Sequence, residues 1–430
     1  MTAPGLTGLT TTGTAAATTA CRTGAAPGGV VDATDPTGRT LGQRLDAATA
    51  GLPAPLVVVD LDALDANAAD VVRRAGGTPV RVASKSVRVR HVLEQVLARP
   101  GFAGVMAYAA AEALWLVGHG VRDVLLGYPT VDTVAIDAVA ADADAAAAVT
   151  FMVDDTAQAD LLTAAARRHG RRLRVCLDVD ASLRLGRGPW AVHLGVRRSP
   201  VRTPDQAAAL AVAVEHRGAL DVRGVMFYEA QVAGLPDTSP AVRLVKAASV
   251  RELARRRADV VDAVATVLGR PLDLVNSGGT GSLEVSAAAP AVTEVTAGSG
   301  LFVPTLFDGY RAFDARPAAY FGLDVVRVPG DGWATVFGGG YVASGPAAPS
   351  RLPRPVWPAG LRLAPREGAG EVQTPLRVPA RADLRVGDRV WFRHAKAGEV
   401  MERFAHVHLV RGDHVEATVP TYRGEGICVG

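Results

Sequence analysis

VTFMVDDTAQADLLTAAARRHGRRLRVCLDVD, residues 149–180, contains two short apolar runs with a longer, periodic segment between them. Within that segment apolar residues recur at steps of three and four and a glycine closes the pattern, which predicts a helix over residues 156–170. The flanking runs are continuously apolar, as in strands that are buried on both faces of a parallel sheet. The stretch therefore predicts one β–α–β unit.

The same alternation extends over most of the first three hundred residues. Most apolar runs begin roughly 19–26 residues apart, which leaves room for one helix and two loops between parallel strands, and the last two gaps are longer. Eight such runs predict an α/β fold, a closed (β/α)8 barrel over residues 41–305, with a doubly wound open sheet as the alternative. The runs are PLVVVD (55–60), VRVAS (80–84), GVMAYA (104–109), DVLLGY (123–128), VTFMVD (149–154), RVCLDVD (174–180), RGVMFYE (223–229) and LDLVNS (272–277).

The pattern changes after about residue 305. Proline becomes more frequent, helical periodicity is lost, and short alternating segments predict a C-terminal β domain over residues 306–430, in which residues 346–360 form a loop. At the other end, residues 1–40 are rich in Thr, Ala and Gly and predict a disordered extension. The clearest strand segments of the β domain are WATVFGGGYV (333–342), DLRVGDRVWFR (383–393) and VHLVRGDHVEATVP (407–420).

Composition and charge exclude several classes of function. The 430 residues carry 46 basic and 43 acidic side chains, a balance too even for a nucleic-acid-binding surface. Cys21, Cys176 and Cys428 lie far apart, so neither a thiolate metal site nor a disulfide framework is indicated, and a reducing cytoplasm fits. We find no apolar window long enough for a membrane span and no signal peptide, so we expect a cytoplasmic protein without a membrane partner.

Lys85 follows the second apolar run, in VRVASKSVR (80–88). A lysine just past a barrel strand points into the mouth of the barrel, where active sites form. When such an amine loses its water its pKa falls, and it can then form a Schiff base. The chain has only three lysines, Lys85, Lys246 and Lys396, against 43 arginines. A sequence that uses arginine for general charge indicates that its few lysines serve where an amine is required, although a surface lysine is the alternative.

Two glycine-rich turns follow late apolar segments of the predicted barrel. The first is Asn276–Gly281, NSGGTG, and the second is Ala297–Gly300, AGSG. Turns of this kind offer backbone N–H groups and hydroxyls to a phosphate group. Two converging loops predict a phosphate-binding cup better than one plain glycine loop does.

Polar side chains also end four other predicted strands. An arginine at a barrel mouth can pair with an oxygen of a cofactor, whereas an Asp–Arg bridge that closes the loop is the structural alternative. Some of the tyrosines are expected to be packed aromatics only. The residues are Asp178, Asp180, Arg184, Tyr228, Glu229, Gln231, Tyr108 and Tyr128.

Taken in order, these motifs resemble the alanine-racemase-like, fold type III enzymes that depend on pyridoxal 5′-phosphate (PLP). The resemblance covers roughly residues 50–430 and is to the D-threonine aldolase and D-serine dehydratase group, which includes actinobacterial amino acid deaminase/aldolases. The motifs that carry it are LVVVDLDALDAN, the lysine after VRVAS, YAAAEALWLVGHG, LLGYP, DVDASLRLG, MFYEAQVAG, NSGGTG and VGDRVWFRHA.

The resemblance implies roles for particular residues. It implies that Lys85 forms the Schiff base with PLP and that Arg184 faces the phenolic oxygen of the cofactor. Tyr228 and Gln231 are implied to lie near the cofactor ring, and His394 matches a histidine that binds a divalent metal in the family. The residues implied to hold the phosphate are Ser277, Gly279, Thr280, Gly298 and Ser299.

Three positions depart from the family's pattern. Ala83 stands where the family often has a histidine, and Gly300 where it usually has a tyrosine. Lys396 stands where a cysteine or an aspartate is expected to bind the metal together with His394. A protonated amine cannot ligate a metal, so no metal ligands are predicted and a divalent metal is doubtful. The alternative is a metal site re-formed from His406, His408, Glu399 or Glu402.

The resemblance thus predicts a PLP-dependent lyase that acts on a β-hydroxy-D-amino acid. Cleavage of Cα–Cβ, as in D-threonine aldol cleavage, gives glycine and an aldehyde, and D-serine-type dehydration and deamination gives a keto acid and ammonia. We expect His394 to act as a base and Lys396 to replace the metal cation, which makes both candidate catalytic residues. The alternatives are an amino acid racemase on the same fold and a non-catalytic PLP-binding protein. A small amino acid substrate and a homodimer are the expected partners.

Overall fold

The computed structural model describes residues 38–429, except for 187–189, 313–315 and 397. The predicted extension over residues 1–40 lies almost wholly outside the described residues, as does Cys21. The first described helix, α2 (Leu41–Ala48), begins after Thr40, whose side chain accepts a hydrogen bond from the backbone of Gln43. In the part of the chain that the structure describes, no helix combines the length and the apolar character that a membrane span requires.

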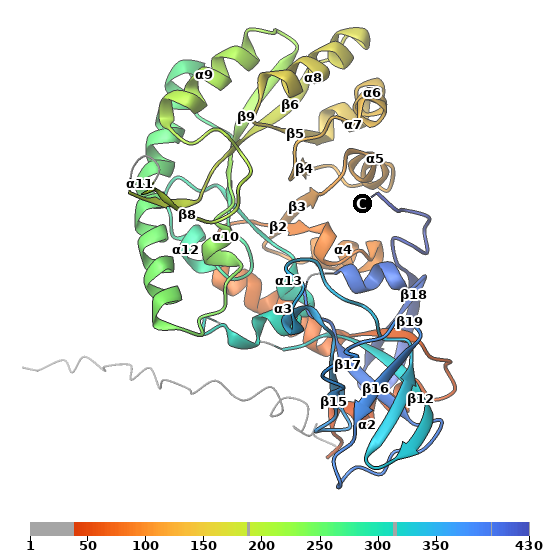
Figure 1. Ribbon diagram of the computed structural model, residues 1–430. Coiled ribbons are helices and arrows are strands. Elements are labelled where there is room, and N and C mark those ends of the chain that lie inside the picture. Colours follow the sequence, from red (N-terminus) through yellow and green to blue (C-terminus); the bar gives the residue numbers. More distant parts are fainter. Residues whose placement is uncertain (1–37, 187–189, 313–315, 397, 430) are drawn as a thin grey trace, which may run out of the picture.

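Eight parallel strands close into a barrel, which confirms the predicted (β/α)8 architecture and excludes the open sheet (Figure 1). Each strand pairs in parallel with both of its neighbours, from β2 around to β11. The strands are β2 (Val80–Ala83), β3 (Phe102–Ala107), β4 (Val124–Leu126), β5 (Val149–Val153), β6 (Leu173–Val179), β9 (Leu220–Phe227), β10 (Leu274–Ser277) and β11 (Glu294–Ala297).

The assignment of residues 55–60 to the barrel is wrong. Strand β1 (Leu56–Asp60) pairs antiparallel with β12 (Ala319–Gly330) and parallel with β18 (His406–Arg411), in the second sheet of the molecule. The remaining barrel strand is β11, which the sequence analysis did not recognise. All five residues of β1 are buried, so a continuous apolar run fits a central strand of either sheet. Lys85 therefore follows the first barrel strand rather than the second.

Helices cover the outside of the barrel, as Figure 1 shows. The helix predicted over residues 156–170 is present as α8, which begins with a capping box between Asp155 and Gln158. Between β6 and α9 the chain inserts a small antiparallel pair, β7 (Leu183–Leu185) and β8 (Val192–Leu194). The helices are α3 (Leu61–Ala75), α4 (Arg90–Leu97), α5 (Ala110–Gly118), α6 (Thr133–Ala141), α7 (Ala143–Ala148), α8 (Thr156–Arg168), α9 (Pro204–Glu215), α10 (Ala230–Ala233), α11 (Pro240–Leu268), α12 (Leu283–Ala287) and α13 (Ser299–Phe302).

Apolar side chains fill the middle of the barrel. Leu125, Met152, Cys176 and Met226 are buried together there, and Met106 and Leu274 pack against them. Cys176 is thus a core residue, and burial raises the pKa of its thiol. Because side chains fill the interior, a site can form only at an open end of the barrel.

A second, nine-stranded sheet contains β1 and the strands that follow the barrel in the chain. It confirms the predicted C-terminal β domain. Its order is β15-β16-β13-β12-β1-β18-β19, and β17 pairs with β12 and β14. The segment 346–360, predicted as a loop, contains β14 and a short 3-10 helix (Pro349–Arg351), so that prediction is wrong in part. The strands not yet given are β13 (Trp333–Phe337), β14 (Arg354–Trp357), β15 (Arg362–Leu363), β16 (Gln373–Arg377), β17 (Arg389–Arg393) and β19 (His414–Pro420).

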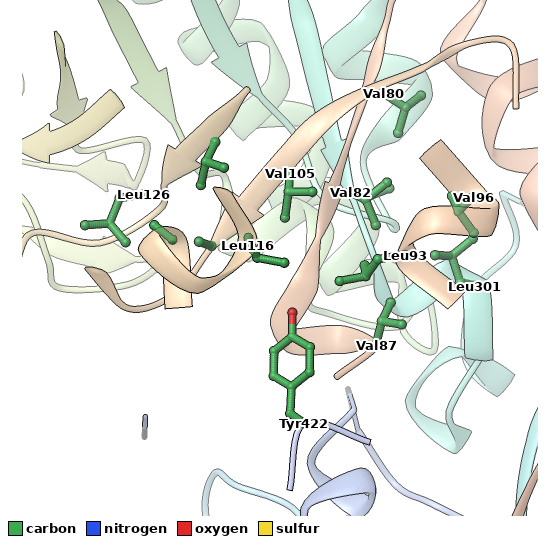
Figure 2. Packing of buried hydrophobic residues seen from close by; sticks show 14 of the residues in the cluster. Val80, Val82, Val87, Leu93, Val96, Val105, Leu116, Leu126, Leu301 and Tyr422 are labelled. Atoms are coloured by element: carbon green, nitrogen blue, oxygen red, sulfur yellow. The ribbon is translucent and has the colours of Figure 1, made fainter. Parts of the chain in front are cut away.

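The C-terminal segment ties the second sheet to the barrel. Tyr422 is fully buried in the same apolar cluster as the barrel strands and directs its hydroxyl toward the barrel (Figure 2). That hydroxyl donates to Glu112 Oε1 at 2.9 Å, while the other carboxylate oxygen accepts from the Tyr108 backbone at 2.7 Å. The Tyr422 amide donates to the carbonyl of Arg88, just past Lys85. The second domain is therefore fixed beside the turn that carries Lys85.

Candidate active site

Lys85 lies at the carboxyl-terminal end of the barrel, in a single 3-10 turn (Ser84–Ser86) that follows β2. The turn is held from both sides, because Ser84 Oγ donates to the carbonyl of Met106 and Arg88 Nε donates to the carbonyl of Lys85. The amine of Lys85 is half-buried and donates a hydrogen bond to Tyr128 Oη at 2.5 Å. The structure thus places one amine at the barrel mouth, next to a phenol, as the sequence predicted for its position.

Tyr128, Tyr228 and Arg198 lie together beside Lys85. The Arg198 guanidinium is 5.5 Å from the ring centre of Tyr128 and 5.3 Å from that of Tyr228. Lys85 Nζ is 5.1 Å from the same Tyr128 ring, so two cations approach one aromatic side chain. The sequence analysis missed Arg198, which lies on the insertion after β8 rather than at a strand end.

Two acidic residues of β6 and its continuation have different surroundings. Burial, together with the charge of Asp154, raises the pKa of Asp178 to about 7, although the charge of Arg198 opposes this rise. Burial would also raise the pKa of Asp180, but hydrogen bonds from Ser182 and the charges of Arg184 and Arg202 hold it below its usual value. Asp178 therefore changes charge near neutral pH, whereas Asp180 stays ionised.

Arg184 forms the loop-closing bridge that the sequence analysis considered as the alternative. Its Nη2 lies 2.7 Å from Asp180 Oδ2, and its side chain is 45% exposed. The contact of Arg184 with a cofactor oxygen stays a prediction that this geometry does not favour.

A buried carboxylate organises the first glycine turn from below. Glu229 Oε2 accepts from Ser277 Oγ at 3.0 Å and from the Gly278 amide at 3.3 Å. Its Oε1 accepts from Ser282 Oγ at 3.0 Å and from Ser286 Oγ. Ser277 Oγ, fully buried, also accepts from Arg257 Nη2 at 2.8 Å. The hydroxyl of Ser277 is therefore already bonded beneath the loop, and its predicted contact with phosphate is not favoured.

The two glycine turns meet each other and the Lys85 turn. Thr280 Oγ1 accepts from the Gly300 amide at 3.0 Å, and Ser299 Oγ lies 3.0 Å from Ser86 Oγ. A Cβ on Gly298 would lie 2.6 Å from the carbonyl oxygen of Ala83, so only glycine permits this approach of the second turn to β2. Ser86 is a further residue that sequence reasoning missed.

The first turn also presents free backbone donors. The amides of Thr280 and Gly281 donate no hydrogen bond to any residue in the described ranges. Backbone N–H groups grouped with hydroxyls form a concavity that suits an anion such as phosphate. With the Lys85 amine nearby, these residues fit the anionic and aldehyde-bearing groups of PLP.

Tyr228 and Gln231 lie beside the first turn. A Cβ on Gly279 would contact the Tyr228 ring at 3.4 Å, so the ring and this turn are neighbours. Burial raises the pKa of the Tyr228 phenol, which stays protonated at neutral pH. Gln231 Nε2 donates to the carbonyl of Ala181 at 2.7 Å, while its buried Oε1 accepts from none of the described residues. Both residues are thus placed close to the predicted cofactor site.

His394 and Lys396 come from the end of β17 in the second sheet and line one cavity of about 360 Å³. His394 is buried, and Lys396 is half-buried. Burial lowers the pKa of Lys396, and the charges of Arg351 and Lys85 lower it further, so this amine lies within electrostatic reach of the barrel mouth. The structure therefore brings His394 and Lys396 to one cavity, and the charge of Lys85 reaches Lys396.

The residues considered for a re-formed metal site do not gather. Glu402 pairs with Arg88 at 2.8 Å, Glu399 accepts from the Ser344 amide at 2.9 Å, and His408 lies 2.8 Å from Thr418 Oγ1. Within residues 38–429, apart from the omitted positions, no three His, Cys, Asp or Glu side chains are grouped so as to hold a metal ion.

Comparison with known proteins gives a consistent result. The family model described as alanine racemase, N-terminal domain matches residues 59–305. A 3-hydroxy-D-aspartate aldolase of Paracoccus denitrificans (strain Pd 1222) is 26% identical over 267 residues, which are 61% of this chain and 63% of the relative. A second 3-hydroxy-D-aspartate aldolase, of Paracoccus denitrificans, is 27% identical over 270 residues. The alignment thus spans less than two thirds of these relatives.

Solved structures share the whole architecture at low sequence identity. The D-threonine aldolase from Filomicrobium marinum superposes with a TM-score of 0.75 at 21% identity, over 87% of this chain and 96% of that one. The D-threo-3-hydroxyaspartate dehydratase from Delftia sp. HT23 superposes with a TM-score of 0.66 at 22% identity, over 86% and 98% of the two chains. Both comparisons support the fold of barrel and second sheet.

Proposed function

The chain belongs to the family of the alanine racemase N-terminal domain, and we propose that it is a PLP-dependent lyase acting on a β-hydroxy-D-amino acid. The observation that carries the proposal is the Lys85 amine, which is bonded to Tyr128 at the barrel mouth and lies on a turn that contacts the second glycine turn. The relatives named as aldolases and a dehydratase for hydroxylated D-amino acids support the choice of reaction. The free thiols of Cys176 and Cys428 are compatible with a cytoplasmic protein.

In this proposal, residues at the barrel mouth bind and orient the cofactor. Lys85 holds the cofactor covalently, while the Thr280 and Gly281 amides and the Ser299 hydroxyl bind its phosphate. When bound, PLP supplies an electron sink for breaking bonds at the α-carbon of the amino acid. Tyr128 accepts a hydrogen bond from the Lys85 amine and so orients it toward the cup formed by the two turns.

The second sheet provides the residues for the β-hydroxyl group. His394 takes the proton from the hydroxyl, or from the α-carbon in a dehydration. The Lys396 ammonium donates hydrogen bonds to the β-oxygen and offsets its negative charge, the part that a metal ion plays in other lyases. Neighbouring cations and burial lower the pKa of Lys396, which brings it closer to proton transfer near neutral pH.

The cavity beside Lys396 favours a substrate with a carboxylate on its side chain. Arg403 and Arg423 line this cavity and are exposed, and their side chains make no ion pair or hydrogen bond with the described residues. Glu399 and Glu402 also line it, but with Arg88 and Lys396 the excess of charge is positive. We therefore favour a 3-hydroxyaspartate-like substrate over D-threonine.

The exposed Leu185, Val192 and Trp190 side chains on the β7–β8 insertion support a homodimer.

An absorbance scan of the purified protein tests the proposal first. We expect the visible band of lysine-bound PLP, and borohydride should fix the cofactor to the peptide that contains Lys85. The protein should then convert D-threonine, D-serine or 3-hydroxy-D-aspartate in preference to the L forms. Glycine with an aldehyde indicates cleavage, and ammonia with a keto acid indicates dehydration. A colourless protein that takes up no PLP overturns the proposal, and loss of optical activity alone identifies a racemase.

Metal analysis tests the part assigned to Lys396. Protein treated with a chelator should keep its turnover, and Lys396→Ala should lower turnover while PLP affinity stays within about twofold. Lys396→Arg, which keeps the positive charge, should recover part of the loss. Stoichiometric zinc or manganese, together with activity that chelation removes and metal restores, would contradict this assignment.

A further inference from the structure

Arg198 is an exposed cation at the barrel mouth whose side chain forms no ion pair with the described residues, although its charge acts on the buried Asp178. It lies in the segment between β8 and α9, and its guanidinium approaches the rings of Tyr128 and Tyr228 at 5.5 and 5.3 Å. Tyr128 is the residue that accepts the hydrogen bond of Lys85. Arg198 therefore belongs to the same small group of side chains as the lysine that is proposed to hold the cofactor.

The backbone next to Arg198 is fixed to the end of β6. Ser199 is buried, and its Oγ donates to the carbonyl of Asp178 at 2.7 Å. The same oxygen accepts from the Val201 amide at 3.1 Å, and the Asp180 amide donates to the carbonyl of Val201 at 2.8 Å. Because three hydrogen bonds anchor this short segment, the position of Arg198 is set by the barrel and not by a free loop.

Three other arginines of this region, unlike Arg197 and Arg198, have acidic partners among the described residues. Arg184 pairs with Asp180 at 2.7 Å, Arg202 pairs with Glu252 at 3.2 Å, and Arg256 pairs with Glu252 at 2.7 Å. Arg198 itself is exposed and makes neither a hydrogen bond nor an ion pair with the described part of the chain.

The contacts of Arg198 leave its hydrogen-bonding edge available. A guanidinium that packs on aromatic rings uses its faces, and its five N–H groups lie in the plane and still point outward. That planar edge matches an oxyanion, which it can bind with two parallel hydrogen bonds. The charge of Arg198 acts on the buried Asp178, but the two side chains form no hydrogen bond or ion pair among the described residues, so the donors of Arg198 remain available to a ligand.

We propose that Arg198, rather than Arg184, is the guanidinium that binds an oxyanion beside Lys85. Two sources offer this chemistry, the ring oxygen of PLP and the α-carboxylate of the amino acid substrate. Either group would be brought to the barrel mouth by a cofactor bound at Lys85, so the inference rests on the proposed function. It adds an anion-binding residue that the resemblance assigned to a different position of the sequence.

Arg198→Gln tests this proposal through two separate readouts. The first is the dissociation constant of PLP from the apoprotein, and the second is the KM of the PLP-loaded enzyme for D-threonine and for 3-hydroxy-D-aspartate. We expect a rise of at least about tenfold in one readout, about 1.4 kcal/mol. A rise in the PLP constant identifies the ring oxygen as the ligand, and a rise in KM alone identifies the carboxylate. Arg198→Lys keeps the charge but loses the planar fork, so its value in the affected readout should lie between those of the wild type and Arg198→Gln.

Two further variants make the result decisive. Arg197→Gln removes the neighbouring exposed arginine and should change neither readout by more than about twofold. Arg184→Gln tests the competing assignment and should have a smaller effect than Arg198→Gln. The proposal is overturned if Arg198→Gln leaves both readouts within twofold of the wild type, or if Arg184→Gln matches its effect. A wild-type protein that binds no PLP overturns the proposed function and this inference together, whereas wild-type PLP binding with an unaffected Arg198 variant overturns the inference alone.

Discussion

At the amino-terminal end of the barrel, Arg81 donates to Glu294 at 2.6 and 2.8 Å and to Asp123 at 2.8 and 3.0 Å. At the carboxyl-terminal end, the Lys85 amine has a single phenol as its hydrogen-bond partner among the described residues, and the Arg198 guanidinium lies against two aromatic rings. The same closed sheet therefore holds a fully bonded cation at its floor and incompletely bonded cations at its mouth.

The difference separates stability from function. Removing an ion from water costs several kcal/mol, and only complete bonding in the interior offsets that cost. Arg81 is 3% exposed and has that complete bonding, so its ion pairs close the amino-terminal end of the barrel. The mouth is open to solvent, where an incompletely bonded charge costs little and stays available to a ligand. Substitutions at the floor should therefore reduce stability, and substitutions at the mouth should reduce binding and turnover.

Lys85→Ala is the strongest test of the mouth. Without the amine, PLP cannot be held covalently, and we expect turnover to fall by at least about a thousandfold. The melting temperature of the apoprotein should hardly change, because Lys85 is half-buried and makes one side-chain hydrogen bond. The measurements are an absorbance scan, turnover and thermal unfolding. A variant that unfolds but keeps visible PLP would reverse the comparison.

Arg81→Met is the matching test of the floor. It leaves Glu294 buried without its cation, and we expect the free energy of unfolding to fall by about 3–5 kcal/mol. PLP affinity and turnover of the folded fraction should stay near wild-type values, since the residue lies at the opposite end of β2 from Lys85. Arg81→Met combined with Glu294→Gln should recover part of the stability, because no lone carboxylate is then buried. Loss of turnover without loss of stability would contradict the assignment.

Glu229→Gln examines the boundary between the two roles. The amide replaces a carboxylate that accepts four hydrogen bonds beneath the first glycine turn, so the turn should loosen. We expect PLP affinity to fall about tenfold, which is about 1.4 kcal/mol. Ser286→Ala, which removes one of the four donors, should have a smaller effect. Equal PLP affinity in Glu229→Gln and the wild type would show that the turn does not depend on this carboxylate.

Asp178→Asn is expected to leave PLP affinity nearly unchanged and to change how stability depends on pH. Burial and the charge of Asp154 raise the pKa of Asp178 from 3.8 to about 7, so the folded apoprotein holds this proton more tightly than the unfolded chain. Its contribution is therefore fully present below about pH 4 and is lost as the pH rises toward 7, with a slope of at most about 1.4 kcal/mol per pH unit. The asparagine variant should lack this loss. Urea unfolding at several pH values measures it, and parallel curves for the two proteins would refute the assignment.

Most of the barrel was predictable because each unit carries its own local signal. The apolar runs of β2 to β6 and the capping box of α8 depend on residues that are neighbours in the sequence. Strand β11 was missed because Glu294 and Thr296 interrupt its apolar character. Both side chains bond to Asn276 of the adjacent strand inside the barrel. The polar side chains of this strand are explained only by their hydrogen-bond partners on the adjacent strand, which the sequence alone does not reveal.

The site was predictable to the extent that it lies at strand ends. Lys85, Tyr128 and the two glycine turns follow barrel strands, so a parallel barrel must bring them to one end. Arg198 follows no barrel strand, and the bond from Ser199 to the carbonyl of Asp178 places it. Arg184 lies in a family-like motif, yet its position on β7 turns it toward Asp180. A local ion pair thus holds Arg184, whereas a contact between separate segments places Arg198 beside Tyr128.

The sequence by itself determined the alternation of buried strands and helices, the change to a β domain near residue 305, and the amine at the end of an early strand. These features follow from periodicity and turn chemistry, which act over a few residues. The tertiary structure alone decided that β1 joins the second sheet and that β11 closes the barrel. It also decided that Lys396 reaches the vicinity of Lys85. A short apolar run indicates that a strand is buried. Hydrogen bonds and packing between segments hundreds of residues apart determine which strands it pairs with.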